Sequence, residues 1–275
     1  MSISGQNLSI VIVTLKSEKV IHECIKSINQ NVPIIVVEHS NNQKFKDDLE
    51  QKYKNLKCIL SKDNLGMGTG NNIGIKASNT DYVLILNPDV LLEKNTLEEL
   101  FEASKNLKEF SILAPLEKNF INYGFFNKKK INKNLETSPF QVDFVDGFAM
   151  LINKKNFKEA NYFDENFFMY LENNDLCKRS RDKGNLIYVV PRSKINHLAA
   201  KTVDKKYEDE VEFSRNWHWI WSKFYFNKKH YGFFSAILKT FYNLVSACFK
   251  FFVYSIIFNS HKKKIYKMRL CGIYS

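Results

Sequence analysis

The sequence predicts an α/β protein, in which a mostly parallel β-sheet carries helices on both faces and a basic helical tail follows. Short apolar runs alternate with segments of helical period over roughly the first 115 residues. Of the 275 residues, 44% are hydrophobic and 25% are charged, which is typical of a folded globular chain. All 29 acidic residues precede residue 213, whereas residues 213–275 hold eleven Lys and Arg.

The expected strands are runs of β-branched and other apolar residues. They cover residues 8–14, 34–37, 58–60 and 82–86, and ordered structure is expected again at 142–152 and 186–190. Helices are expected at 17–29 and 44–54, after the Gly-rich turn within 61–74, from Asn95 onwards, and at 172–183. Because parallel strands need crossover connections, this alternation favours a parallel sheet. Residues 118–140 are rich in Asn and Lys without a clear period, which predicts a surface excursion.

The distribution of charge divides the chain into a body, residues 1–212, and a tail, residues 213–275. The body has a net charge near +1 and the tail +11, whereas a nucleic-acid binder is usually basic throughout, so we expect no nucleic-acid partner. Five scattered cysteines form no CxxC pair, which excludes a disulfide scaffold and a zinc ribbon and fits a reducing compartment. The N-terminus has neither a basic segment nor a small-residue cleavage site, so we expect a cytoplasmic protein.

Polar residues follow each of the first four expected strands. They are Thr14, Glu38, Asp63 with Asn64, and Asn87 with Asp89. Ligands bind at the carboxyl ends of the strands in open parallel sheets, so these residues are candidates for one shared site. Each alone is more often an ordinary turn residue, and the alternative for Asp89 is a helix cap or turn residue. A carboxylate after a buried strand is nevertheless costly unless it is paired, hydrogen-bonded or bound to metal.

The stretch from Gly66 to Gly74 reads GMGTGNNIG. A dinucleotide-binding loop is disfavoured, because the third glycine falls one residue early and the stretch follows the third strand instead of the first. Two interpretations remain. One is a tight turn with a close helix–strand contact, and the other is a nucleotide-sugar pocket in which small residues let the ligand approach the backbone.

Titratable residues in the second half of the body form another candidate group. Glu172 and Asp175 are three residues apart and share a face if a helix begins there. The alternative is an acidic helix start that the helix dipole stabilises. His197 comes just after an expected strand, where a single histidine is more often structural than functional.

Four segments, in this order, resemble the family 2 glycosyltransferases of the GT-A fold, and in particular their rhamnosyltransferase-like branch. They are Ile34–Glu38, Asn64–Gly74, Leu86–Val90 and Phe163–Cys177. His197 falls where that family places a metal-binding histidine. The resemblance spans roughly residues 8–202 and implies a Rossmann-like nucleotide-diphospho-sugar transferase. Such an enzyme transfers a sugar, here with rhamnose as the candidate, to a cell-surface polysaccharide or a lipid-linked glycan with inversion.

The resemblance also implies roles for individual residues. Thr14 and Glu38 would contact the nucleobase and ribose, and Asp146 with Gly147 would lie beside the donor and acceptor sugars. Asp89 occupies the family's Asp-x-Asp motif and, with His197, would hold Mg²⁺ or Mn²⁺. A hard divalent cation with few protein ligands suits a diphosphate leaving group. The remaining donor-site residues would be Asp63, Asn64, Gly66, Gly70, Asn71 and Asn87.

The sequence departs from the family pattern at two places. Leu15-Lys16 follows the first strand where the family usually has Tyr-Asn. Asn173 stands where the family has the Asp that acts as general base, and a neutral amide cannot accept a proton. Either Glu172 or Asp175 is then the base, or the enzyme is impaired. On the sequence alone, Asn173→Asp is expected to raise activity.

The tail predicts an amphipathic helix at a membrane surface. Ser235, Lys239, Asn243, Ser246 and Lys250 fall within a wedge of about 80° on a helix, and we call this set the polar wedge. Lys239 and Lys250 leave uncharged stretches of only about ten residues, short of the ~20 that a spanning helix needs. A basic cluster at 261–269 would meet anionic headgroups, and aromatic residues at 217–226 would form an interfacial belt. Packing on the body, or on a second copy in a homodimer, is the alternative.

The sequence therefore predicts a metal-dependent glycosyltransferase attached peripherally to the cytoplasmic face of the plasma membrane. A sugar-phosphate nucleotidyltransferase is a rival, although residues 14–17 lack the glycines that its phosphate loop would need. A catalytically impaired nucleotide-sugar binding protein at the membrane is the other rival, because of Asn173.

Overall fold

The computed structural model describes residues 4–107, 109–126, 137–157, 162–198 and 208–274. It divides the chain into two compact units, each treated by itself below. The sheet unit comprises Met1–Asp164 and Asn173–Thr202, and the helical unit comprises Glu165–Glu172 and Val203–Ser275. The division falls ten residues before the boundary expected after residue 212, and a short internal segment belongs with the helices.

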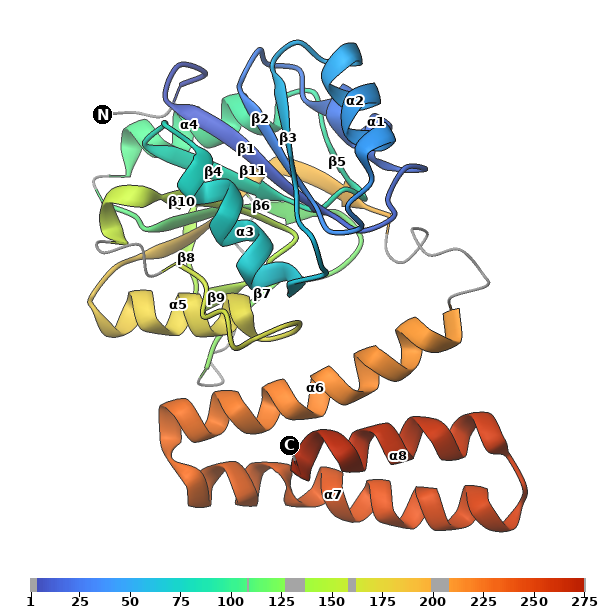
Figure 1. Cartoon of the computed structure of the whole chain (residues 1–275). Helices are drawn as coiled ribbons and strands as arrows, with labels where there is room; N and C mark the ends of the chain where they lie inside the picture. The colour runs from blue at the N-terminus through green and yellow to red at the C-terminus, as the bar shows by residue number, and fades with distance from the viewer. Residues whose placement is uncertain (1–3, 108, 127–136, 158–161, 199–207, 275) are drawn as a thin grey trace. The chain divides into compact units, whose positions relative to one another are not determined.

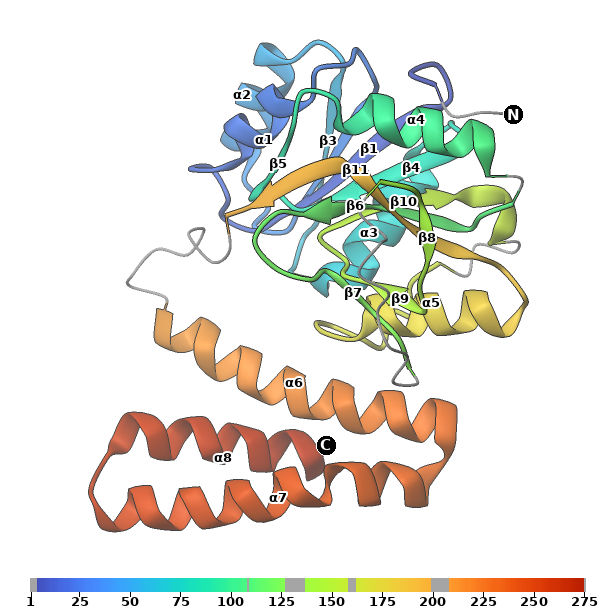
Figure 2. The same ribbon diagram turned by 180° about the vertical axis from the view of Figure 1, so that it is seen from behind.

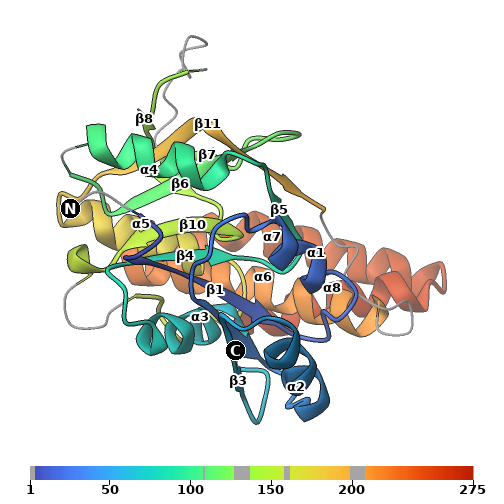
Figure 3. The same ribbon diagram turned by 90° about the horizontal axis from the view of Figure 1, so that it is seen from above.

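The sheet unit contains one large mixed sheet. Its strands are β1 (Leu8–Thr14), β2 (Ile34–Glu38), β3 (Leu56–Leu60), β4 (Tyr82–Leu86), β5 (Val90–Leu92), β6 (Ile112–Glu117), β8 (Phe140–Gln141), β10 (Ala149–Asn153) and β11 (Ile187–His197). The order is β3-β2-β1-β4-β10-β6-β11-β5, with β8 beside β11. Figure 3 shows from above how β3, β1, β4, β10, β6 and β11 succeed one another. The strands from β3 to β4 are all parallel, whereas β10 and β5 run antiparallel to their neighbours. A small separate sheet pairs β7 (Tyr123–Gly124) with β9 (Phe144–Val145).

Helices cover both faces of this sheet, as predicted (Figures 1 and 2). One hydrophobic core joins the sheet to α1 (Ile21–Ser27), α2 (Gln43–Lys52) and α4 (Thr96–Asn106). The other joins it to α3 (Gly66–Ala77) and α5 (Glu172–Asp182), and a 3₁₀ turn, η1, covers Lys154–Asn156. The pleat of β1 supplies both cores, because Ile10 and Ile12 point to one face while Val11 and Val13 point to the other. All seven residues of β1 are buried, as a central strand requires.

The glycines of α3 allow it to pack closely on β1. A Cβ at Gly74 would lie 2.3 Å from Val11 Cγ1, and one at Gly70 would lie 2.8 Å from Val13 Cγ1. A side chain at either position would force the helix away from the sheet. The close helix–strand contact considered for this stretch is therefore present, and the glycines lie inside the helix instead of in a turn before it.

The element boundaries agree with the sequence where the apolar signal is strong. The strands at 8–14 and 82–86 have the predicted bounds, whereas the helix expected at 17–29 is confined to Ile21–Ser27. The last strand continues to His197 instead of ending near residue 190. Within the expected excursion at 118–140, residues 127–136 lie outside the described residues, and β7 and β8 lie on either side of them.

The helical unit consists of α6 (Glu208–Tyr231), α7 (Phe233–Ile256) and α8 (Ser260–Tyr274), each packed against the other two. Within the described residues, α7 is the one helix long and apolar enough to cross a membrane. Lys239 and Lys250 lie within this helix, as the amphipathic pattern predicted, and they do not keep its length and composition from meeting the criterion for a span. Of the aromatic rings expected to form an interfacial belt, Trp221 stacks on Tyr225 and both contact Phe167, whereas Trp219 is exposed; the belt itself stays a prediction.

Candidate active site

The register of β1, β2 and β3 aligns the carboxyl ends of these strands. Thr14 pairs with Glu38, and Glu38 pairs with Leu60. The chain stays aligned beyond the strands, because the His39 N–H donates to the Thr14 carbonyl (2.9 Å) and the Ser61 N–H donates to the Glu38 carbonyl (2.9 Å). The residues predicted after the first three strands therefore occupy one edge of the sheet.

Glu38 is fully buried, and its carboxylate stabilises its own loop. The carboxylate accepts hydrogen bonds from the Ser40 N–H (2.7 Å) and the Ser40 hydroxyl (2.8 Å), and a longer one from the Asn42 N–H (3.4 Å). These bonds offset the cost of burying the charge. Its contact with the nucleotide stays a prediction.

His39 is a site residue that the sequence analysis missed. The side chain is buried, with Nδ1 at 3.2 Å from the Asp63 carbonyl and at 3.4 Å from the Leu65 nitrogen. It thereby links the end of β2 to the loop that holds Asp63 and Asn64. Burial lowers the pKa of His39, so the neutral ring is favoured. Its place directly after the strand-end Glu38 was the available signal.

Four buried polar atoms at this edge have no hydrogen-bond partner among the described residues. They are Thr14 Oγ1, His39 Nε2, Asn71 Oδ1 and Asn87 Oδ1. Buried polar groups are nearly always satisfied, so a cluster of unsatisfied ones indicates a polar ligand or ordered water. Three of the four were predicted from the sequence. Close by in the chain, the exposed residue Asn64 accepts a hydrogen bond from the Gly66 N–H (3.1 Å) at the start of α3.

Asp89 and His197 meet although 108 residues separate them in the sequence. β5 pairs with the end of β11, so that His197 lies opposite Val90, and the Leu198 N–H donates to the Asp89 carbonyl (2.9 Å). His197 Nε2 then lies 3.4 Å from Asp89 Oδ1, with both side chains largely buried.

Two residues that the sequence analysis did not identify hold His197 in place. The Phe148 ring stacks on the imidazole with centroids 4.3 Å apart. The buried Glu117 accepts a hydrogen bond from the His197 N–H (3.2 Å) and others from Asn119. No local sequence signal distinguishes Phe148 or Glu117 from ordinary core and turn residues.

The Asp89–His197 pair fits a divalent cation. Two ligands of one octahedral cation with bonds of about 2.1 Å lie about 3 Å apart, close to the separation found here. A carboxylate oxygen and an imidazole nitrogen are both suitable donors. An Nε2 that carries a proton would donate it to the Asp89 carboxylate, whereas an Nε2 without one is an acceptor and leaves room for a cation between the two atoms.

Asp146 lies near this pair. Burial raises the pKa of its carboxyl, and the charge of His197, when protonated, acts in the opposite direction. The Asp146 N–H donates to the Asn122 carbonyl (2.9 Å), which fixes the backbone just before β10. Asp146 is therefore close enough to His197 for the two charges to interact, and the place of Asp146 and Gly147 beside the donor and acceptor sugars stays a prediction.

The three candidate residues at the start of α5, Glu172, Asn173 and Asp175, lie in different environments. Asn173 is buried and its amide donates to the Val145 carbonyl (2.7 Å), next to Asp146. Asp175 is fully buried and ion-paired with Arg179 (2.7 Å). Glu172 Oε2 is buried without a partner among the described residues, and burial raises the pKa of Glu172 to about 7. Tyr170 and Leu171, just before it, have φ angles of 70° and 64°, a strained conformation that often occurs at functional sites.

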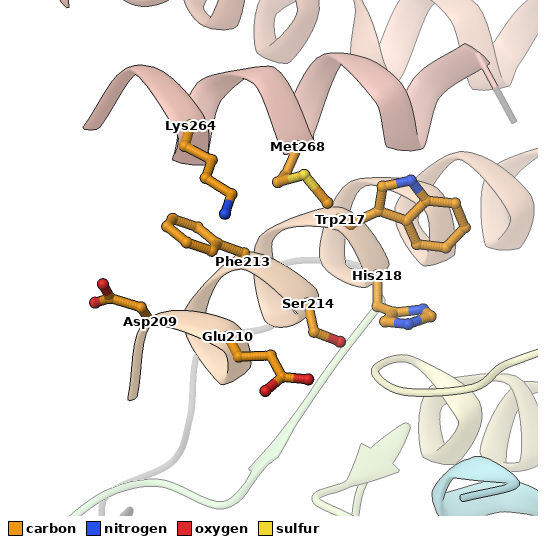
Figure 4. A pocket seen from close by; sticks show the side chains of 8 residues that line it. All are labelled: Asp209, Glu210, Phe213, Ser214, Trp217, His218, Lys264 and Met268. Atoms are coloured by element: carbon orange, nitrogen blue, oxygen red, sulfur yellow. The ribbon is translucent and has the colours of Figure 1, made fainter. Parts of the chain in front are cut away.

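The helical unit has a hollow of its own, of about 780 Å³, between α6 and α8. Figure 4 shows Lys264 and Met268 of α8 facing Phe213 and Trp217 of α6 across it. It is open to solvent and contains none of the predicted site residues. Nearby, Asp209 and Glu212 lie at the start of α6, where the helix dipole already favours acidic residues. Both form exposed ion pairs with His261 of α8. We therefore place the active site at the sheet edge.

Comparison with known proteins identifies the family of the chain. The family model "Glycosyl transferase family 2" matches residues 9–172, well over half of the chain. Rhamnosyltransferase WbbL of Escherichia coli K12 is 28% identical over 241 residues, covering 76% of this chain and 88% of that protein. The low-salt glycan biosynthesis hexosyltransferase Agl10 of Haloferax volcanii is 27% identical over 234 residues, covering 76% of this chain and 69% of that protein.

Solved structures show the same fold. A structure of GalNAc-T7 with UDP, GalNAc and Mn²⁺ superposes with a TM-score of 0.58 at 15% identity, covering 87% of this chain and 57% of that one. At this identity the likeness establishes the GT-A fold alone. The family match, the fold and the polar edge of the sheet lead to one conclusion: the chain belongs to glycosyl transferase family 2 and is a glycosyltransferase.

Proposed function

We propose that this protein transfers a sugar, with rhamnose as the first candidate, from a nucleoside-diphosphate donor to a lipid-linked or polysaccharide acceptor, with inversion at the anomeric carbon. The observation that carries the proposal is the group of unsatisfied buried polar atoms at the carboxyl ends of β1, β2 and β4, beside the Asp89–His197 pair. A nucleotide with ribose hydroxyls and a diphosphate presents the polar groups that such an edge would bind. WbbL, a rhamnosyltransferase, supports rhamnose as the sugar to test first.

In the proposed reaction, an acceptor hydroxyl oxygen attacks the anomeric carbon as the bond from that carbon to the diphosphate oxygen breaks. The diphosphate departs with the bonding electron pair. A carboxylate takes the hydroxyl proton. A single displacement from the opposite side inverts the configuration.

Glu172 is our assignment for that carboxylate. A general base works best with a pKa near the working pH, and burial brings the pKa of Glu172 to about 7. The ion pair with Arg179 makes Asp175 a poorer candidate, because protonating its carboxylate would break a buried pair. Asn173, through its bond to the Val145 carbonyl, would position the strand that leads to Asp146.

Asp89 and His197 would hold Mg²⁺ or Mn²⁺, the ion that neutralises charge on the departing diphosphate when bound. The protein's own part is to fix these two side chains, which the β5–β11 pairing, Phe148 and Glu117 do. Thr14, His39, Asn71 and Asn87 would contact the nucleotide and sugar.

The exposed apolar helix α7 is consistent with membrane association. We propose that the protein works at the cytoplasmic face of the plasma membrane, where a lipid-linked acceptor would be within reach.

A panel of nucleotide sugars, assayed by thermal shift with Mn²⁺ and with EDTA, tests the proposal. Stabilisation by one donor only in the presence of Mn²⁺, followed by transfer to a lipid-linked acceptor with inversion by NMR, would support it. Binding without any turnover over a full acceptor panel would favour the catalytically impaired binder. Formation of nucleotide sugar from sugar phosphate and nucleoside triphosphate would favour the nucleotidyltransferase.

A further inference from the structure

The polarity of α7 is the reverse of what a helix in a water-soluble bundle needs. Its buried residues are small: Ala236, Thr240 and Ala247. Its large apolar side chains face outward, with Leu238 77% exposed and Tyr242 80% exposed. In water the apolar stripe of a helix turns toward its partners, and here it turns away from them.

These large side chains form one continuous surface. At about 100° per residue they fall within an arc of about 100° on the helix. We call this surface the outward face; it consists of Phe234, Leu238, Phe241, Tyr242, Phe249 and Phe252, all more than half exposed. A contiguous exposed apolar patch of this kind marks an interaction surface.

The polar wedge of α7 lies between the outward face and the small buried residues, and three of its side chains reach toward α6 and α8. The Lys239 ammonium lies 3.7 Å from the centre of the Tyr231 ring, and the Asn243 carbonyl accepts a hydrogen bond from Lys223 of α6 (2.7 Å). The Lys250 ammonium lies 5.4 Å from the centre of the Tyr266 ring of α8. Small and polar residues at helix–helix contacts, with large apolar ones outside, are the arrangement that helices adopt in lipid.

We propose that α7 lies flat in one leaflet of a bilayer, with its outward face among the acyl chains and α6 and α8 toward the headgroups. The inference rests on the proposed membrane location. It adds which surface of the protein enters the bilayer and how α7 is oriented there. On the helix, Lys239 and Lys250 lie beside the outward face instead of opposite it, so their ammonium groups can reach the interface.

A spanning orientation conflicts with the charges of the helical unit. Lys239 and Lys250 are about 16 Å apart along the axis, so both would lie within the ~30 Å hydrocarbon core. α8 packs along α7 and would enter the core as well. It would bring five further cations, each costly in hydrocarbon: Lys262, Lys263, Lys264, Lys267 and Arg269. Length and composition permit a crossing, but the packing of α8 opposes it.

Charge identifies lipid, and not a second copy of the chain, as the occupant of the outward face. Residues 213–275 carry eleven cations and no acidic residue, so two copies placed face to face would repel each other. Anionic headgroups would attract the same charges. Phe258, in the turn between α7 and α8, is 90% exposed with φ at 54°, an unusual conformation for an aromatic residue, and would extend the inserted surface.

Co-sedimentation with 70:30 phosphatidylcholine–phosphatidylglycerol vesicles tests the surface. We expect the full chain to bind and to stay bound in 1 M NaCl, because burial of apolar area is not screened by salt. Leu238→Glu/Phe249→Glu should lower the vesicle partition coefficient at least ~100-fold. Gln51→Glu/Asn79→Glu, at exposed positions of the sheet unit, changes the net charge equally and should alter the coefficient less than ~2-fold.

Labelling from outside the vesicles tests the orientation. In a chain with Cys248→Ser and Cys271→Ser, Ser235→Cys and Asn259→Cys mark the two ends of α7. If α7 lies flat, an impermeant maleimide labels both ends, whereas protection of either end overturns the flat orientation. Unchanged partition of the Leu238→Glu/Phe249→Glu variant, complete release of the wild type at 1 M NaCl, or a dimer that ignores vesicles overturns the proposed surface. Donor-induced thermal shift without vesicles reports on the transferase proposal separately.

Discussion

The approach of Asp89 Oδ1 to His197 Nε2, 3.4 Å apart, is the contact on which the proposed metal chemistry rests at the scale of single residues. A carboxylate oxygen and an imidazole nitrogen at this separation can share either a proton or a metal ion. The unsatisfied buried polar atoms at this edge of the sheet are the groups that our proposal assigns to the donor.

Substitution of either proposed metal ligand should weaken binding of the ion and of the donor while the protein still folds. We expect Asp89→Ala to abolish turnover and to weaken Mn²⁺-dependent binding of the donor diphosphate at least ~100-fold. His197→Ala should do the same less severely, because water replaces one ligand readily. Calorimetric titration of donor with and without Mn²⁺ measures this. Asp47→Ala, on the exposed side of α2, is the control, and full activity of Asp89→Ala in excess EDTA would contradict the metal assignment.

Substitution of the two carboxylates of α5 should have different consequences. Glu172→Gln should lower kcat by about 10²–10⁴-fold with donor affinity unchanged. A base must be ionised, so the wild-type rate should rise with pH through about 7, where burial places the pKa of Glu172. Asp175→Asn should mainly lower the free energy of unfolding, by about 3 kcal/mol, because Arg179 loses its buried partner. Steady-state kinetics at several pH values decide, and near-wild-type rates in both variants would exclude both carboxylates.

At the scale of a single helix turn, the structure changes the expectation for position 173. The Asn173 amide donates to the Val145 carbonyl, and an aspartate would place a carboxylate against that carbonyl instead. Asn173→Asp should therefore lower the free energy of unfolding by about 1–3 kcal/mol and should not raise turnover. Chemical denaturation and kcat measure the two effects. Asn174→Asp is the control, since the first turn of a helix tolerates an acid there; a more active Asn173→Asp would restore the original expectation.

At the scale of elements, the close contact between α3 and β1 predicts that substituting its glycines lowers stability. Gly70→Ala would place a Cβ 2.5 Å from His39 Nε2, and Gly74→Ala would place one 2.3 Å from Val11 Cγ1. We expect each to lower the free energy of unfolding by about 1–3 kcal/mol, and Gly70→Ala also to weaken donor binding through His39. Thermal unfolding and donor titration measure both effects. Gly5→Ala, which meets no atom closer than 3.7 Å, should be nearly neutral.

At the scale of the whole molecule, the boundary between the two units determines where the chain can be shortened. Phe167 is fully buried, its ring lies 4.8 Å from that of Tyr225, and the Ser222 hydroxyl donates to the Met169 carbonyl (2.7 Å). α6 thus stabilises the segment that leads into Glu172. α6 and residues 165–172 therefore form one compact unit.

Two truncations test this boundary. A chain ending at residue 231 keeps α6 and should bind donor but not vesicles. A chain ending at residue 202 leaves Phe167 without α6, so its melting temperature should fall and its kcat should drop with it; losing that burial costs about 1.5–3 kcal/mol. Thermal unfolding and donor titration of the two chains are the measurement. Equal stability of the two would show that α6 does not support the Glu172 segment.

The sequence by itself determined the features that local pattern encodes. Uninterrupted β-branched runs specified β1 and β4 to the residue, and the alternation of strands with helices specified a parallel sheet. Because parallel strands end at one edge, the same pattern brought Thr14, Glu38, Asn87 and Asp89 to one region without any knowledge of contacts. The motif order then identified the family, which the comparisons confirm.

Only the tertiary structure decided what depends on residues distant in the chain. The meeting of Asp89 with His197 requires the antiparallel β5–β11 pairing, and the roles of His39, Phe148 and Glu117 depend on neighbours that no local window contains. The same holds for α5, where burial and partners distinguish Glu172 from Asp175. For α7 the periodicity correctly separated a polar wedge from an apolar face, but packing decides that Ala236, Thr240 and Ala247 turn toward α6 and α8 while the large apolar side chains stay exposed.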